Sequence, residues 1–340
     1  MGMANPKNTG TLAVIGAGLA GLAAASRLAA QGHAVTLIDK ARGVGGRMAT
    51  KRFGELRVDT GAQFFTVTDT RFQQWLAPLI AAGEAFEWTR GFALWRDGKI
   101  TPRPDGHVRY ACRSGMSAVA KRLADDARSA GAQLLLGQPA STLKRDAQGY
   151  TVTLQDGTAI QAGRVVLNLP PEQLLALAGH LLDPQLATAI RACAFDPCFA
   201  IYCALAEDLR ADWKGLELEG HPVFSWIARD HTRRAPDSPP VLVAHTTPEW
   251  SRRHLEENPE CVATLAGEAL RELLPEVQPS GTPAFHCHRW RYARPTQTLE
   301  APLADPRLAI CGDWTLAFPQ AGRVEGAFIS GFTLLYQGHE

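Results

Sequence analysis

Runs of apolar residues along the chain predict short strands and a few helices. Near the start, the apolar run at 11–15 predicts a buried strand, and the alanine-rich segment 22–30 predicts a helix. A second apolar run at 35–38 ends in Asp39. Short buried strands that alternate with a helix are typical of a parallel βαβ unit. The pattern therefore predicts an α/β fold whose first unit covers residues 11–39.

The rest of the chain adds further strands and helices and changes character in its middle. Strands are predicted at 133–136, 140–143, 150–154, 158–161, 164–169, 199–204, 241–246 and 308–313, and helices at about 118–130 and 259–274. Asp156-Gly157 is typical of a hairpin turn. The span 192–283 mixes sheet and helix, and a closing helix is expected within 322–331. We therefore expect a second domain inserted into the first.

A glycine-rich turn, Gly16-Ala17-Gly18-Leu19-Ala20-Gly21, joins the first strand to the first helix. In a dinucleotide site, Gly16 would allow the tight turn, Gly18 the approach of a pyrophosphate, and Gly21 the close packing of helix and strand. The helix N-terminus would offer free N–H groups and a positive dipole end to the phosphates. Asp39 stands where a ribose-binding acid belongs. This context favours a dinucleotide site over a βαβ unit with glycines for packing alone.

Two segments that follow indicate which dinucleotide binds. Segment 39–48 contains a second glycine pair and an arginine, and segment 58–65 contains a further glycine. FAD has a second phosphate and a ribitol, for which Gly45, Gly46 and Arg47 can supply donors. The alternative is an exposed glycine loop with a surface arginine. Only one dinucleotide fingerprint occurs, so a nicotinamide would bind as a substrate and not in a βαβ domain of its own.

These N-terminal segments resemble the FAD domain of the flavin amine oxidase superfamily. Four later segments extend the resemblance: 222–229 (PVFSWIAR), 288–295 (HRWRYARP), 311–314 (CGDW) and 322–331 (GRVEGAFISG). The first two of them point more narrowly to the bacterial renalases. The resemblance runs from about Leu12 to about Leu335, nearly the whole chain. One departure is segment 315–321, which looks longer than usual and could alter substrate preference.

The resemblance implies an α/β fold in which an FAD-binding Rossmann-type domain, of the p-hydroxybenzoate hydroxylase and amine oxidase type, carries an inserted α+β substrate domain. The FAD-binding domain is expected to be discontinuous, with residues 11–72, 108–190 and 284–340, and the substrate domain to take 73–107 and 191–283. Residues 1–10 are polar and lack the apolar core of a signal peptide, so we expect a disordered leader there.

The glycine turn, the two segments after the second strand and the C-terminal segments supply the residues expected to bind FAD. These residues are Gly16, Gly18, Ala20, Gly21, Asp39, Lys40, Gly45, Gly46, Arg47, Met48, Gly61, Ala62, Gln63, Phe64, Ala140, Gly312, Asp313, Arg323, Val324, Glu325, Gly326 and Ala327. The C-terminal part has no cysteine motif for covalent attachment, because Cys311 fits strand packing. The FAD is therefore expected to be non-covalent.

The renalase resemblance implies oxidation of isomeric dihydronicotinamides. Hydride from 2- or 6-dihydro-NAD(P) would reach flavin N5, NAD(P)⁺ would leave, and O₂ would take the electrons to give hydrogen peroxide. Such a substrate needs no general base, because its ring nitrogen lone pair expels the hydride and the product is aromatic. The lysine that amine oxidases place near N5 is expected to be missing, since Lys214 is the only lysine after Lys144 and fits an exposed turn.

An aromatic site with few ionisable groups would suit this chemistry. The candidate catalytic residues are Gln63, Trp226, His245, Trp290 and Tyr292. His245 fits a hydrogen-bonded structural histidine equally well. Trp290 and Tyr292 share a strand face, and ordinary packing in the hydrophobic core explains such an aromatic pair equally well. The arginines of segment 229–234 could meet substrate phosphates, although an arginine cluster beside prolines is more typical of a solvated loop.

Two other functions stay open at this point. The same fold could oxidise a small amine, which would release an aldehyde or imine. The chain could also be a non-catalytic flavin-bound redox sensor, although its aromatic insert and full set of FAD residues disfavour this. Fold analogy alone does not choose among the three.

Composition agrees with a globular enzyme. Hydrophobic residues make up 46% of the 340 residues, charged residues 20%, and the formal net charge is +1, so neither nucleic acid nor a membrane surface is expected as a partner. No apolar run has the length of a membrane span. The seven cysteines are odd in number and favour free thiols in a reducing cytoplasm. No metal site is expected, including at His286-Cys287-His288, which fits a strand.

Overall fold

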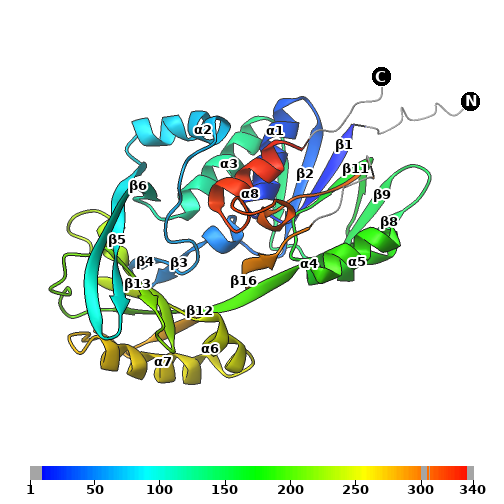
Figure 1. Ribbon diagram of the computed structural model, residues 1–340. Coiled ribbons are helices and arrows are strands. Elements are labelled where there is room, and N and C mark those ends of the chain that lie inside the picture. The colour runs from blue at the N-terminus through cyan, green and yellow to red at the C-terminus, as the bar shows by residue number, and fades with distance from the viewer. Residues whose placement is uncertain (1–9, 300–304, 306, 335–340) are drawn as a thin grey trace, which may run out of the picture. The chain divides into compact units, whose positions relative to one another are not determined.

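The computed structural model describes residues 10–299, 305 and 307–334. The backbone forms two compact units, each drawn from separate stretches of the chain (Figure 1). The first unit runs through Gly46 and continues with Val119–Ala194 and the chain from Pro295, and the second takes Arg47–Ala118 and Phe195–Arg294. The predicted leader, residues 1–10, lies outside the described residues apart from Gly10.

A parallel sheet with the strand order β17-β11-β1-β2-β7 forms the centre of the first unit. Its strands are β1 (Thr11–Ile15), β2 (Ala34–Asp39), β7 (Gln133–Leu136), β11 (Arg164–Leu167) and β17 (Leu308–Ile310). Helix α1 (Leu19–Ala30) connects β1 to β2, as a parallel pair of strands requires. The predicted βαβ unit and α/β fold class are confirmed.

The remaining elements of the first unit include an antiparallel meander and several helices. They are β8 (Ala140–Arg145), β9 (Tyr150–Leu154), β10 (Ala159–Ala162), α3 (Ser117–Ser129, which begins at the unit boundary), α4 (Pro171–Ala178), η2 (Gly179–Leu181), α5 (Pro184–Ala192), η4 (Asp313–Thr315) and α8 (Val324–Phe332). The Asp156-Gly157 turn is confirmed, with the Leu154 N–H donating to the carbonyl oxygen of Thr158 at 2.8 Å.

Two strands of this unit are shorter than the apolar pattern predicts. The strand expected at 164–169 ends at Leu167, because Pro170 caps α4 and Pro171 occupies its first turn. The strand expected at 308–313 ends at Ile310, where the backbone turns into the short helix η4. Apolar side chains therefore continue past the last strand residue in both places.

A seven-stranded sheet with the order β16-β12-β15-β14-β13-β5-β6 dominates the second unit. The elements of this unit are η1 (Gly46–Met48), β3 (Thr50–Phe53), β4 (Leu56–Asp59), α2 (Thr70–Ala81), β5 (Ala85–Arg96), β6 (Lys99–Cys112), β12 (Ala194–Ala204), β13 (Gly215–Glu219), β14 (Phe224–Arg229), η3 (Asp230–Arg233), β15 (Val241–Thr246), α6 (Pro248–Arg253), α7 (Pro259–Leu273) and β16 (His286–Gln297). The predicted strand at 241–246 is confirmed to the residue.

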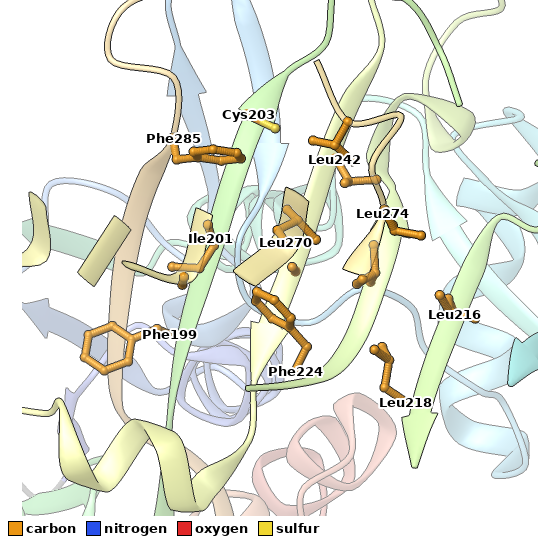
Figure 2. Packing of buried hydrophobic residues seen from close by; sticks show 14 of the residues in the cluster. Phe199, Ile201, Cys203, Leu216, Leu218, Phe224, Leu242, Leu270, Leu274 and Phe285 are labelled. Atoms are coloured by element: carbon orange, nitrogen blue, oxygen red, sulfur yellow. The ribbon is translucent and has the colours of Figure 1, made fainter. Parts of the chain in front are cut away.

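Side chains along each strand point alternately to the two faces of this sheet, and the two faces differ in what they pack against. In β12, Phe199 and Ile201 pack with Phe224 and with Leu270 of α7, so α7 and the neighbouring α6 cover one face (Figures 1 and 2). Tyr202, the residue after Ile201, has its side chain on the opposite face of the sheet and belongs to a different cluster, together with Ala200. That second face carries the residues of the candidate site described below.

The unit boundaries differ from those of the expected FAD-binding and substrate domains. Residues 47–72, 108–118 and 284–294, expected in the FAD-binding domain, lie in the second unit, and 191–194 lie in the first. The reason is packing, because Val58 of β4 clusters with Tyr202 and Val243, and β16 is an edge strand of the large sheet. Which unit serves the cofactor and which the substrate stays a proposal.

No helix among the described residues is long and apolar enough to cross a membrane.

We expect Gly331→Ala to lower the free energy of unfolding by about 1–3 kcal/mol. A Cβ at Gly331 of α8 would lie 1.9 Å from the carbonyl oxygen of Ala20 in α1, so the two helices would have to separate. Urea unfolding measures the change. The control is Gly179→Ala, whose Cβ would meet only Leu175, at 3.7 Å. Equal midpoints for the two variants would contradict the prediction.

Candidate functional site

The glycine turn of the first unit is closed tightly enough to exclude side chains. Gly16 has φ of 108°, and a Cβ there would lie 2.1 Å from the carbonyl oxygen of Asn168. A Cβ on Gly21 would lie 2.0 Å from the carbonyl oxygen of Gly16. Both positions therefore need glycine, as the sequence predicts for a tight turn and close packing of helix and strand.

Asp39, at the end of β2, reaches back to this turn. One carboxylate oxygen accepts the Ala17 N–H at 2.5 Å, and the other accepts the Ala41 N–H at 2.6 Å. The Gly45 N–H donates to the carbonyl oxygen of Ala17 at 2.8 Å. The structure thus brings Asp39 and the second glycine pair against the first glycine turn.

The N-terminus of α1 fits a dinucleotide pyrophosphate. Its capping residue, Gly18, makes no side-chain hydrogen bond, and the first turn holds no acidic residue. The first N–H groups of a helix have no partner within the helix, and its dipole favours an anion there. Within the described part of the chain, no side chain caps this helix, and glycines leave room for a phosphate to approach.

Asn168 is a part of this turn that the sequence analysis missed. Its Nδ2 donates to the carbonyl oxygen of Gly16 at 3.1 Å, and it would lie 2.8 Å from a Cβ on Gly18. A signal was present, because Asn168 is a polar residue directly after the apolar strand β11. The carboxyl ends of neighbouring parallel strands meet at one edge of a sheet, where ligands bind.

The other predicted cofactor residues of the first unit occupy several places. Gly312 donates its N–H to Ser330 Oγ at 3.0 Å, and Asp313 and Glu325 are buried acids. Arg323 caps α8, whose first turn contains Val324 to Ala327. Lys40 Nζ donates to Gln173 Oε1 at 3.2 Å, on α4. Ala140 opens β8. The roles of all these residues toward FAD stay predictions.

The second unit joins two of the sequence segments that indicated FAD. The Ala62 N–H donates to the carbonyl oxygen of Arg47 at 2.9 Å, and a Cβ on Gly61 would lie 1.9 Å from that oxygen. Gly61 is therefore fixed as glycine by close backbone contact. The Arg47 guanidinium donates to the carbonyl oxygen of Ala293 at 3.1 Å and lies over the Phe195 ring. The neighbouring Met48 is buried.

A single carbonyl oxygen, that of Thr60, connects two of the candidate catalytic residues. Trp290 Nε1 donates to it at 2.9 Å, and His245 Nε2 lies 3.0 Å from it. The carbonyl is only an acceptor, so His245 carries its proton on Nε2. Burial lowers the pKa of His245 to about 4. His245 is therefore a neutral imidazole at physiological pH.

The amide of Gln63 is engaged at both ends. Its Nε2 donates to the carbonyl oxygens of Asp59 and Gly61, and its Oε1 accepts from Arg233 Nη2 at 3.1 Å. Arg233 also donates to the Gln63 carbonyl oxygen. Gln63 thus fixes the turn that follows β4, and the hydrogen bonds in this structure give it a positioning role.

The expectation of a solvated arginine loop at 229–234 is wrong. Arg233 and Asp230 are fully buried and paired, and Arg234 pairs with Asp59 at 2.6 Å and with Asp230 at 2.9 Å. The short helix η3 turns these side chains inward, where each charge meets an opposite one. Arg229 pairs with Asp208 and donates to the carbonyl oxygens of Ala211 and Trp213.

Trp226 lies in an aromatic cluster of the second unit. Its ring centroid is 4.6 Å from that of Phe92 and 5.8 Å from that of Phe64. Trp226 Nε1 is buried and has no hydrogen-bond partner among the described residues. Tyr292 makes an edge contact with Phe195 at 6.0 Å. Trp290 and Tyr292 lie on the same strand, β16, as predicted, and their catalytic roles stay predictions.

The first unit therefore has the glycine turn and the acidic residue after β2 that are typical of a dinucleotide site. Comparison with known families agrees. A match to the family described as "Flavin containing amine oxidoreductase" covers residues 77–333, more than half of the chain, and an "NAD(P)-binding Rossmann-like domain" matches residues 14–79. The chain belongs to the flavin-containing amine oxidoreductase family. This membership confirms the predicted oxidoreductase class and FAD cofactor; the renalase subtype belongs to the proposal below.

Individual relatives support the fold more than the activity. Phytoene desaturase (neurosporene-forming) of Rhodobacter capsulatus is 44% identical over 71 residues, which are 21% of this chain and only 14% of the desaturase. Putrescine oxidase bound to putrescine superposes with a TM-score of 0.77 at 16% identity, covering 95% of this chain and 97% of that one. Cyclohexylamine oxidase from Brevibacterium oxydans gives 0.74 at 14% identity, with 95% and 97% covered. These similarities show a shared fold.

We expect Arg233→Met to lower the free energy of unfolding by about 3–5 kcal/mol, because it removes one of the two guanidinium groups that neutralise the buried Asp230 and leaves both buried acceptors of Gln63 without this donor. Urea unfolding followed by circular dichroism measures the loss. The control is Arg96→Met, which breaks the solvent-exposed pair with Glu219. This control is expected to leave the midpoint unchanged. Equal effects of the two substitutions would contradict the buried role of Arg233.

Proposed function

We propose that this protein is an FAD-dependent oxidase of the renalase type, which oxidises 2- or 6-dihydro-NAD(P) to NAD(P)⁺. Bound FAD would supply a two-electron acceptor that passes its electrons on to O₂ and yields hydrogen peroxide. One observation carries the choice of substrate: His245 on the candidate face is neutral and lies in register with Trp226, which belongs to an aromatic cluster.

The residues of this chain would hold the cofactor in the following way. The turn at Gly16 and the N-terminus of α1 would receive the pyrophosphate, and Asp39 would accept from the ribose hydroxyl groups. The backbone at Gly61 and Ala62, fixed against Arg47, would serve the distal part of the cofactor. We also propose that the attachment is non-covalent. Cys311 is buried and burial raises its pKa, so it offers no reactive thiolate.

A neutral aromatic site suits a dihydronicotinamide. The ring nitrogen lone pair expels the hydride and the product ring is aromatic, so no protein group has to remove a proton. Trp226 and Trp290 offer flat apolar surface against which a nicotinamide ring can stack. The Nε2–H group of His245 donates to the Thr60 carbonyl oxygen. Because the imidazole is uncharged, it does not repel the positive charge that develops on the pyridinium product.

An amine is the alternative substrate. The family name and the similarity to putrescine oxidase and cyclohexylamine oxidase favour it. Lys214 is a poor candidate for the lysine that amine oxidases place near flavin N5, because it is exposed and donates to the carbonyl oxygen of Trp88 at 2.7 Å. The seven free thiols favour a reducing compartment, and we propose the cytoplasm.

Anaerobic titration of the purified holoenzyme with 6-dihydro-NAD should bleach the visible flavin band with one equivalent and release NAD⁺. Hydride loss from this ring needs no assistance from a base, so the reduction should be fast. Putrescine and cyclohexylamine serve as the comparison, and dithionite confirms that the flavin can be reduced. Bleaching by an amine with release of an aldehyde, and none by 6-dihydro-NAD, would move the assignment to amine oxidation.

The rate of flavin reduction by 6-dihydro-NAD should be flat between pH 6 and 9 and should fall below about pH 5. His245 has a lowered pKa of about 4, so it is neutral across the flat range and gains charge only at the acid end. An alkylamine substrate would instead react faster as pH rises toward about 10, where its ammonium loses a proton. Stopped-flow absorbance across this range distinguishes the two profiles.

A further inference from the structure

A dinucleotide substrate carries phosphates. The arginines of segment 229–234, which the sequence analysis considered as phosphate ligands, instead form ion pairs with aspartates of this protein. Arg233 pairs with Asp230 and donates to Gln63, and Arg234 pairs with Asp59 and Asp230. These side chains hold the turn after β4 and cannot also meet a ligand without breaking the buried pairs. The cation that a substrate phosphate would need must lie elsewhere.

Lys51 has the place in the fold that this role requires. It lies in β3 directly opposite Val58 of β4, so the two side chains share a face of the β3–β4 hairpin. Val58 packs with Tyr202 and Val243 on the face of the large sheet that α6 and α7 do not cover. Trp290 packs against the same cluster. Lys51 is therefore placed on the hairpin face that packs against the candidate-site face of the large sheet.

No carboxylate of the residues that the structure describes pairs with Lys51. Among the described residues, no hydrogen bond or ion pair reaches its ammonium. Its electrostatic neighbours are Cys287 and His288 of β16. Burial, with a smaller contribution from Lys51, lowers the pKa of His288 to about 4, and burial raises that of Cys287 to about 12, so both are uncharged at pH 7. Lys51 is half-buried, and burial lowers its own pKa, as expected for an ammonium without a partner.

We propose that Lys51 binds a phosphate of the substrate, in a subsite formed with the β16 side chains His288 and Trp290; this rests on the proposed dihydronicotinamide activity. An ammonium is a compact point charge that suits a phosphate oxygen. Edge contact between His288 and Trp290, with ring centroids 4.3 Å apart, forms an uncharged wall beside it. The same charge would repel a protonated amine, so Lys51 would also contribute to specificity.

Lys51 acts on the phosphate and not on the reacting ring, so it should affect binding of the substrate more than chemistry. A contact present equally in the ground state and the transition state raises KM when lost and leaves kcat unchanged. Three substrates separate the phosphates from the ring: the 6-dihydro forms of nicotinamide riboside, of the mononucleotide and of the dinucleotide. The riboside carries no phosphate and is the internal control.

The experiment compares wild-type holoenzyme with Lys51→Met, Lys51→Arg and Arg52→Met. Arg52 is the matched control, because it is an exposed cation on the same strand and, one residue on, faces the other side. For Lys51→Met we expect KM for a phosphate-bearing substrate to rise about tenfold, as is usual for loss of a charge-assisted hydrogen bond. Its kcat, and KM for the riboside, should stay unchanged. Lys51→Arg should recover most of the loss, and Arg52→Met should behave like wild type.

Other outcomes overturn the inference and separate it from the proposed activity. Equal KM changes for riboside and dinucleotide would show a structural effect, and no change in either would show a solvated lysine. If wild type oxidises none of the three substrates, the proposed activity fails. Binding of NAD⁺ and of nicotinamide riboside to the oxidised holoenzyme, followed by flavin absorbance, then tests Lys51 directly. Affinity for NAD⁺ that is unaltered by Lys51→Met would reject the phosphate subsite itself.

Discussion

The pairing of two buried arginines with two buried aspartates is the interaction on which the site of the second unit depends. Arg233 and Arg234 come from one short helix, whereas Asp59 ends β4, far away in sequence. Asp59 also accepts N–H and O–H donors from Met116 and Thr50. Removing any one of these four charges would leave an unbalanced charge in the buried cluster, which is far more costly than losing an exposed pair. The turn from Asp59 to Gln63 is therefore held from several directions at once.

Because that turn is fixed, the Thr60 carbonyl can organise the face of the large sheet. Trp290 and His245 come from different strands, β16 and β15, and both point their N–H donors at this oxygen. The shared acceptor selects one tautomer of His245, and burial keeps it uncharged. The Thr60 carbonyl thus fixes the orientation of Trp290 and of an uncharged His245 on this face of the sheet. Such a surface favours a planar, uncharged reacting ring.

Local patterns predicted the βαβ unit and its glycine turn well. The glycine turn, the strands around it and Asp39 follow directly along the chain, so spacing alone places them in one βαβ unit. The sequence analysis did not identify Asn168, because its hydrogen bond to Gly16 depends on the pairing of β11 with β1, which are far apart in sequence. The arginines of η3 were misjudged because the flanking prolines describe the local backbone and say nothing of the aspartates that meet them.

The sequence by itself determined the α/β class, the Rossmann-type glycine turn and the residue types of the candidate site, since all of these depend on short-range spacing and side-chain chemistry. Only the tertiary structure decided which charges are paired and which are left over. Arg233 and Lys51 are both cations in polar segments, yet one is neutralised in the core and the other faces uncharged neighbours. The difference arises from burial and from partners distant in sequence, which set the free energy of a charge and are fixed only when the sheets pack.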